Sequence, residues 1–112
     1  MADPAPPSEA PAEAAIPGLP EEASSRILAL LRAEPAVHEV WLFGSRAMGR
    51  HRPGSDIDLT LVAPHLTHND RLRLMAALDD LLLPWSIDLS LHHELPEALR
   101  APVARVGRLL AP

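Results

Sequence analysis

The chain has 112 residues, 47% of them hydrophobic, which suits one globular domain with a modest core. It contains no cysteine, so disulfide bonds and thiolate metal sites are excluded. It has no lysine, and its formal net charge is −5. This acidic balance argues against direct, non-specific binding to nucleic acid, which depends on basic side chains that neutralise phosphates.

The N-terminal sequence MADPAPPSEAP is acidic and rich in proline. It has neither the basic region nor the apolar region of a signal peptide, and no apolar run elsewhere is long enough to cross a membrane. We therefore expect a cytoplasmic protein that makes no membrane contact. Residues 1–19 have almost no large apolar side chains, which predicts a disordered tail, and residues 20–112 are expected to form the domain.

Hydrophobic periodicity and turn residues predict alternating helices and strands. The first helix is expected to begin near Pro20, which suits a first helical turn, and to stop before Pro35. In chain order we then expect strands over 37–43 and 56–62, a helix over 68–83, a strand over 85–91 and a helix from after Leu95 to about Gly107. This order predicts an α/β fold in which helices cover a small sheet.

The same periodicity predicts which helical residues are buried. In the helix over 68–83, capped near Asn69 or Asp70, the residues expected to face the core are Leu72, Met75, Ala76, Leu78 and Leu82. In the last helix the expected core stripe is Leu99, Val103 and Val106, and Pro102 is expected to interrupt the helix.

Three aspartates fall on the polar faces of the two alternating strands. Asp56 and Asp58 are two residues apart, so their side chains project from the same face about 6–7 Å apart. Asp88 lies on the polar face of the strand over 85–91, and it joins them if the two strands are neighbours. Three carboxylates repel one another, and a divalent cation such as Mg²⁺, which prefers oxygen ligands, would compensate their charge.

A short loop after the strand over 37–43 has the residues of a phosphate site. Gly44 allows a tight turn and a close approach of the backbone to a ligand, and Ser45 can cap a short helix that starts at Arg46. Arg50 and Arg52 add positive charge to the same loop. A phosphate site beside metal-binding carboxylates is typical of enzymes that transfer phosphoryl or nucleotidyl groups.

These residues occur at the spacing of a known family. Gly44 and Ser45, then ten residues, then Asp56 and Asp58 resemble the motif of the DNA polymerase β-like nucleotidyltransferase superfamily. The surrounding sequence, with Asp88 in WSIDLSL downstream, is similar to the minimal nucleotidyltransferase (MNT) family over about residues 24–112. The resemblance implies a nucleotidyltransferase core with a small mixed sheet backed by helices.

The resemblance also implies roles for the site residues. Asp56 and Asp58 would bind two Mg²⁺ ions, and Asp88 would hold the catalytic metal and help to activate the incoming hydroxyl. Gly44 and Ser45 would hold the β- and γ-phosphates of ATP. We also expect Arg46 to lie near these phosphates. Family members often read GSRARG, whereas this chain has methionine in place of the second arginine.

Proteins of the MNT family commonly act as antitoxins that pair with a HEPN-domain toxin encoded by a neighbouring gene. The resemblance therefore implies an enzyme that transfers AMP from ATP to a toxin hydroxyl, typically that of a tyrosine. Two alternatives stay open. The chain could neutralise its toxin by binding and occlusion without catalysis, or a hetero-oligomer could transfer the nucleotide to a small molecule.

Structural roles are alternatives for the individual residues. Asp56 lies in the sequence PGSD, which has turn chemistry, and Gly44 and Ser45 could serve only a turn and a helix cap. Asp88 could be a solvent-facing strand residue. The adjacent pair His92 and His93 lacks the spacing of metal ligands and is expected in a loop or a helix cap.

Overall fold

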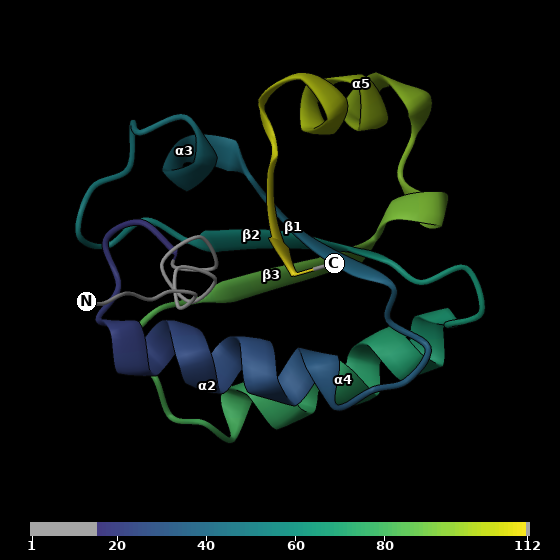
Figure 1. The fold of residues 1–112 in the computed structure, drawn as a ribbon, viewed down its shortest axis with the longest axis horizontal. Helices are drawn as coiled ribbons and strands as arrows, with labels where there is room; N and C mark the ends of the chain where they lie inside the picture. Colours follow the sequence, from purple (N-terminus) through teal and green to yellow (C-terminus); the bar gives the residue numbers. More distant parts are fainter. Residues whose placement is uncertain (1–15, 112) are drawn as a thin grey trace, which may run out of the picture.

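The computed structural model describes residues 16–111, so most of the predicted tail lies outside the described residues. The elements, drawn in Figure 1, are α2 (Glu21–Arg32), β1 (Glu39–Phe43), α3 (Gly44–Ala47), β2 (Ile57–Val62), α4 (His68–Asp79), β3 (Ile87–Leu91), η1 (His92–Glu94), α5 (Glu97–Val106) and β4 (Arg108–Ala111). The prediction of an α/β fold with a mixed sheet backed by helices is confirmed.

The strands form one four-stranded sheet in the order β3-β2-β1-β4. β1 runs antiparallel to both β2 and β4, whereas β2 and β3 are parallel. Two parallel strands need a crossover connection, and α4 provides it between β2 and β3. This connection makes β3 the edge strand next to β2.

Helices lie on both faces of the sheet (Figure 1). The long helices α2 and α4 lie side by side on one face, and α3 and α5 lie on the other. The apolar positions of β2, Ile57, Leu59 and Leu61, are fully buried, as the strict alternation predicts. Thr60, on the opposite side of β2, is also fully buried, because that face is covered too.

Helix α4 starts as predicted but ends earlier. Thr67 is its N-cap and forms a capping box with Asp70, so the cap lies slightly before the predicted positions. The helix stops at Asp79, and Leu82 has a positive φ of 57° and is 86% exposed. The prediction that Leu72, Ala76 and Leu82 face the core is wrong, since all three are exposed. The buried residues of this helix are Leu78, as predicted, and Leu74.

The C-terminal region differs most from its prediction. α5 runs through position 102 without a break, so the predicted interruption of the helix is wrong. The predicted burial of Leu99 and Val106 is wrong, since they are 53% and 37% exposed. The strand β4 follows at once and pairs with β1, and its Leu110 and Ala111 are buried instead.

The last residues of the predicted tail belong to the folded unit. Ile16 is only 1% exposed, and its backbone N–H donates to Oγ of Ser24 at 3.0 Å. The folded domain therefore includes residues 16–19, which the prediction had assigned to the tail. No helix among residues 16–111 is long and apolar enough to span a membrane.

Candidate functional site

Two of the predicted carboxylates face each other across neighbouring strands. Asp58 on β2 and Asp88 on β3 are direct register partners in the parallel ladder, and Asp56 precedes β2. Burial raises the pKa of Asp58, and the negative charges of Asp88 and Asp56 raise it further, while Arg46 acts in the opposite direction. The three carboxylates are therefore close enough to interact, and their repulsion is only partly compensated by the protein.

The predicted phosphate loop lies directly against this carboxylate group. Phe43, the last residue of β1, is the register partner of Asp58, and Gly44 follows it. Gly44 has a positive φ of 75°, and a Cβ on Gly44 would collide with Oδ2 of Asp58. Only glycine fits this position without strain, because it combines a left-handed backbone with contact to a carboxylate oxygen.

Ser45 lies within the short helix α3. The helix begins at Gly44, and its N-cap is Phe43, which makes no side-chain cap bond. The prediction that Ser45 caps the helix is therefore wrong. Its carbonyl oxygen accepts a hydrogen bond from the backbone N–H of Arg50 at 2.8 Å, which closes the loop after the helix. Gly44 and Ser45 thus lie at the end of β1, beside the carboxylates.

Arg46 is buried in this structure, not open to the loop surface. Its side chain is 1% exposed, and its two terminal nitrogens donate to backbone carbonyl oxygens, Nη1 to Pro17 at 2.7 Å and Nη2 to Ser55 at 2.9 Å. Arg46 thus binds backbone oxygens on two sides, and its expected position near the phosphates stays a prediction.

The loop between α3 and β2 carries the remaining arginines. Arg50 and Arg52 are exposed, so their charges lie at the surface of this loop. A turn orders the end of this loop: the N–H of Ser55 donates to the carbonyl of Arg52 at 2.9 Å, and the N–H of Arg52 donates to Oγ of Ser55 at 2.8 Å. Ser55 directly precedes Asp56, so this turn sets where β2 begins.

A groove with a volume of about 230 Å³ adjoins Asp88 along the edge strand β3. On its floor, Arg71 Nη1 donates to the carbonyl of Leu89 at 3.0 Å, and Nη2 lies 3.0 Å from Nδ1 of His68. The lining residues are His68, Arg71, Asp88, Leu89, Ser90, Leu91, Glu94 and Leu95. The sequence pattern did not indicate this groove, because its residues come from three separate elements.

The donor set of the carboxylates fits a divalent cation that also binds substrate. Among residues 16–111, no three His, Cys, Asp or Glu side chains are gathered closely enough to enclose an ion by themselves. Mg²⁺ is commonly held by one or two carboxylates together with phosphate oxygens and water. The uncompensated charge around Asp58 is what such an ion would neutralise.

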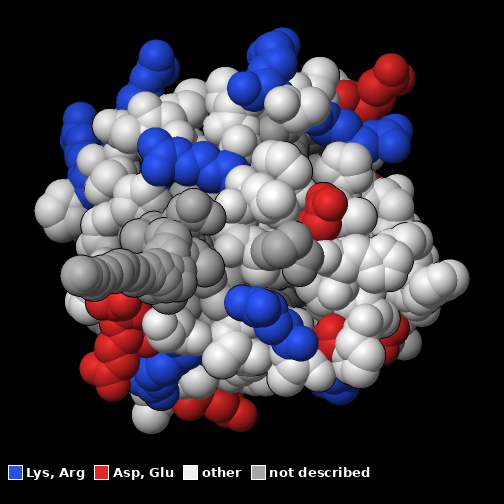
Figure 2. All heavy atoms as spheres, viewed as in Figure 1, with Lys and Arg blue, Asp and Glu red and all other residues white. Residues whose placement is uncertain are grey.

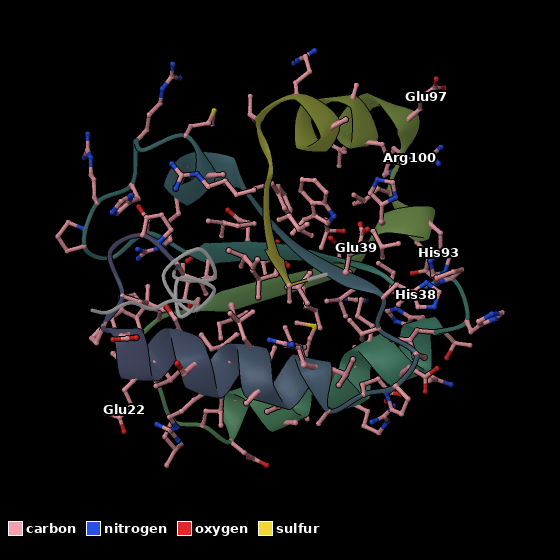
Figure 3. The ribbon with its side chains drawn as sticks, viewed as in Figure 1. Glu22, His38, Glu39, His93, Glu97 and Arg100 are labelled. Atoms are coloured by element: carbon pink, nitrogen blue, oxygen red, sulfur yellow. The ribbon has the colours of Figure 1, made fainter. Side chains whose placement is uncertain are left out.

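Two of the histidines lie at the other end of the sheet. Figure 3 shows His38, Glu39 and His93 at the end of the sheet away from α3, and the carboxyl group of Glu39 accepts a hydrogen bond from the indole of Trp41 at 2.8 Å. His92 and His93 are the first two residues of the short 3-10 helix η1, whose N-cap is Leu91, so the predicted loop or helix-cap position is wrong. Figure 2 shows arginine and acidic side chains interspersed over the face drawn, rather than gathered by sign.

Comparison with known proteins places this geometry in a family. The model of the polymerase beta nucleotidyltransferase family matches residues 25–111. A curated relative, the probable protein adenylyltransferase MntA of Haemophilus influenzae, is 40% identical over 53 residues. That alignment covers 46% of this chain and 46% of the relative, so it spans about half the length of each protein.

Solved structures with the same fold are toxin–antitoxin complexes. A chain of a toxin–antitoxin complex with AMP-PNP matches with a TM-score of 0.67 and 30% identity, covering 77% of this chain and 70% of that chain. A complex of a tri-AMPylated Shewanella oneidensis HEPN toxin with its MNT antitoxin matches with a TM-score of 0.63 and 26% identity, covering 80% and 70%. Both likenesses extend over most of the described residues.

Proposed function

Because this chain belongs to the polymerase beta nucleotidyltransferase family, in its minimal nucleotidyltransferase group, we propose that it is a protein adenylyltransferase that acts as an antitoxin. Its substrates would be ATP and a hydroxyl group, typically a tyrosine, on a HEPN-domain toxin. The relatives named as protein adenylyltransferase and as antitoxin of an AMPylated HEPN toxin support this proposal. The predicted cytoplasmic location stays a prediction from the sequence.

The observation that carries the proposal is the contact of Gly44 with Asp58. It brings the loop expected to hold the β- and γ-phosphates against the carboxylates expected to hold metal. A triphosphate on Gly44 and Ser45 would extend toward Asp56 and Asp58. The left-handed backbone of Gly44, which glycine adopts without strain, lies where the phosphate loop and the carboxylates meet.

The reaction would be an in-line displacement at the α-phosphorus of ATP. The toxin hydroxyl oxygen forms a bond to this phosphorus, the bond from phosphorus to the α–β bridging oxygen breaks, and pyrophosphate leaves. Asp88 is exposed on the edge strand, so it can accept the hydrogen bond of an incoming hydroxyl and orient its oxygen. The proton of the hydroxyl leaves through Asp88 or to solvent.

Asp56, Asp58 and Asp88 would hold Mg²⁺. When bound, this ion neutralises charge on the phosphates and on the attacking and leaving oxygens. The chain's own contribution is to position the groups: β2 and β3 fix the spacing of Asp58 and Asp88, and Gly44 keeps the phosphate loop against them.

The groove along β3 gives the acceptor a route to this site. It reaches Asp88 from the side of the edge strand that carries no neighbouring strand among the described residues. A toxin segment that lies in the groove would present its hydroxyl to Asp88 without crossing the phosphate loop. This arrangement suits an acceptor supplied by another protein.

The decisive experiment is a mass measurement. The product of the neighbouring gene is incubated with this chain, ATP and Mg²⁺, and the intact masses of both proteins are recorded. We expect the partner to gain one or more AMP units, and we expect no gain with Asp56→Asn. Asp79→Asn is the matched control, because Asp79 is an exposed aspartate at the end of α4, away from the site.

Two results would contradict the proposal. A stable complex without any mass gain, with toxin activity still suppressed, would favour neutralisation by occlusion. AMP that appears on a metabolite but never on protein would favour transfer to a small molecule.

A further inference from the structure

We propose that Arg46 is a positioning residue of the nucleotidyltransferase site. We further propose that the N-terminal segment 16–19, called the strap below, holds Arg46 in place. Through Arg46, the strap would hold the end of the loop from which Asp56 projects. The inference rests on the proposed function for its catalytic consequence. The strap lies before the segment 25–111 matched by the family model, whereas Arg46 lies within that segment.

The strap is anchored on the domain at its own residues. Ile16 is buried, and its N–H donates to Oγ of Ser24, a buried residue of α2, at 3.0 Å. A turn then forms, in which the N–H of Leu19 donates to the carbonyl of Ile16 at 3.1 Å. This turn leaves the carbonyl of Pro17 directed at Arg46.

Arg46 connects the strap to the loop between α3 and β2. One terminal nitrogen donates to the Pro17 carbonyl at 2.7 Å and the other to the Ser55 carbonyl at 2.9 Å. The planar guanidinium is rigid, so it fixes the two carbonyls relative to each other. The next residue after Ser55 is Asp56, and the positive charge of Arg46 also acts on Asp58.

The strap fits closely over this connection at Gly18. Its φ is +89°, and a Cβ there would lie 2.5 Å from Nη1 of Arg46 and 2.7 Å from Nε2 of His51. Both distances are too short for real contacts, so any other residue at this position must displace Arg46 or the strap. Nε of Arg46 and Nδ1 of His51 are buried beside Gly18, and neither has a hydrogen-bond partner among the described residues.

The test compares the substitution Gly18→Ala with Gly54→Ala in the full chain. Gly54 lies in the same loop as Ser55, and a Cβ there would meet nothing within 4 Å. Binding of Mn²⁺ is measured by calorimetry in the presence of a non-hydrolysable ATP analogue. AMP transfer is measured in parallel, at a temperature where circular dichroism shows every variant folded. Arg46→Lys is the second variant, because one ammonium cannot hold both carbonyls as a guanidinium does.

We expect Gly18→Ala and Arg46→Lys to weaken Mn²⁺ binding and to lower the AMP transfer rate at least tenfold, as the loss of an orienting contact does. Gly54→Ala should match the wild type. Wild-type Mn²⁺ affinity in folded Gly18→Ala and Arg46→Lys would overturn the inference, and so would an absence of Mn²⁺ binding by the wild type. If the wild type binds Mn²⁺ but transfers no AMP, the proposed function fails, and the metal affinities alone decide the inference.

Discussion

Asp58 and Asp88 occupy the same level of two parallel strands and project from the same face of the sheet. They are far apart in the sequence, and the crossover through α4 brings them together. Their charges are compensated only in part, since among residues 16–111 Arg46 is the cation that acts against the raised pKa of Asp58. The site therefore holds electrostatic repulsion that a bound cation would relieve.

The first prediction concerns the cost of this repulsion. Asp58→Asn should raise the melting temperature of the metal-free protein, because a neutral amide removes a partly buried charge that lies close to two other carboxylates. It should also abolish AMP transfer. Asp79→Asn, on an exposed helix end, should change neither quantity. A lower melting temperature for metal-free Asp58→Asn would contradict the prediction.

The same pKa shift predicts a pH dependence of stability. A carboxyl group whose pKa is raised on folding binds protons more tightly in the folded state, so folding is most favoured below the unfolded pKa. As the pH rises through the raised pKa of Asp58, this contribution is lost. Denaturation of metal-free wild type between pH 3 and pH 7 should show the loss, and Asp58→Asn should lack this component. Identical pH profiles would exclude Asp58 as its source.

The third prediction separates the backbone conformation of Gly44 from its contact with Asp58. Gly44→Ala and Gly49→Ala both place alanine at positive φ, at 75° and 72° respectively. Only Gly44→Ala also drives a Cβ into Asp58, since nothing lies within 4 Å of a Cβ at Gly49. We expect Gly49→Ala to lower the free energy of unfolding by about 1 kcal/mol and Gly44→Ala by about 2–3 kcal/mol. Equal losses in urea denaturation would show that the contact is unimportant.

The fourth prediction concerns the start of α4. Thr67→Ala should lower the free energy of unfolding by about 1 kcal/mol at neutral pH, because it removes the side-chain acceptor of the Asp70 N–H. Hydrogen bonds from Thr67 lower the pKa of Asp70. The stabilisation that ionised Asp70 contributes is therefore present above its unfolded pKa, and it is lost as the pH falls through its folded pKa. The difference between wild type and Thr67→Ala should shrink in acid, and a constant difference would contradict the capping box.

The fifth prediction concerns Leu82, which follows α4 and has a left-handed backbone conformation. Leu82 is 86% exposed at a φ of 57°, so its side chain gains little burial while its backbone is strained. Leu82→Gly should raise the free energy of unfolding by about 1 kcal/mol. Leu72→Gly, at an exposed position inside the helix, should lower it by a similar amount. Thermal denaturation shows whether each variant is more or less stable than the wild type. A destabilised Leu82→Gly would contradict the argument that Leu82 has a strained backbone.

Local patterns in the sequence determined most of the elements. The alternation in IDLTLV identified β2 and its buried face, because residues two apart on a strand point the same way. The spacing of Gly44, Ser45, Asp56 and Asp58 identified the loop and the carboxylates, since each of these chemical roles depends on residue type at close range. These features could be predicted because their physical causes lie within a few neighbouring residues.

Only the tertiary structure decided which distant segments meet. In the folded chain β3 pairs with β2, which sets Asp88 beside Asp58. The strand β4 completes the sheet and contributes buried residues, whereas Leu99 of the predicted core stripe is exposed. It also buried Arg46 between the carbonyl groups of Pro17 and Ser55, a pair of contacts that the sequence alone did not indicate. Burial and hydrogen-bond partners depend on contacts across the whole chain, so a residue's type and immediate neighbours do not determine them.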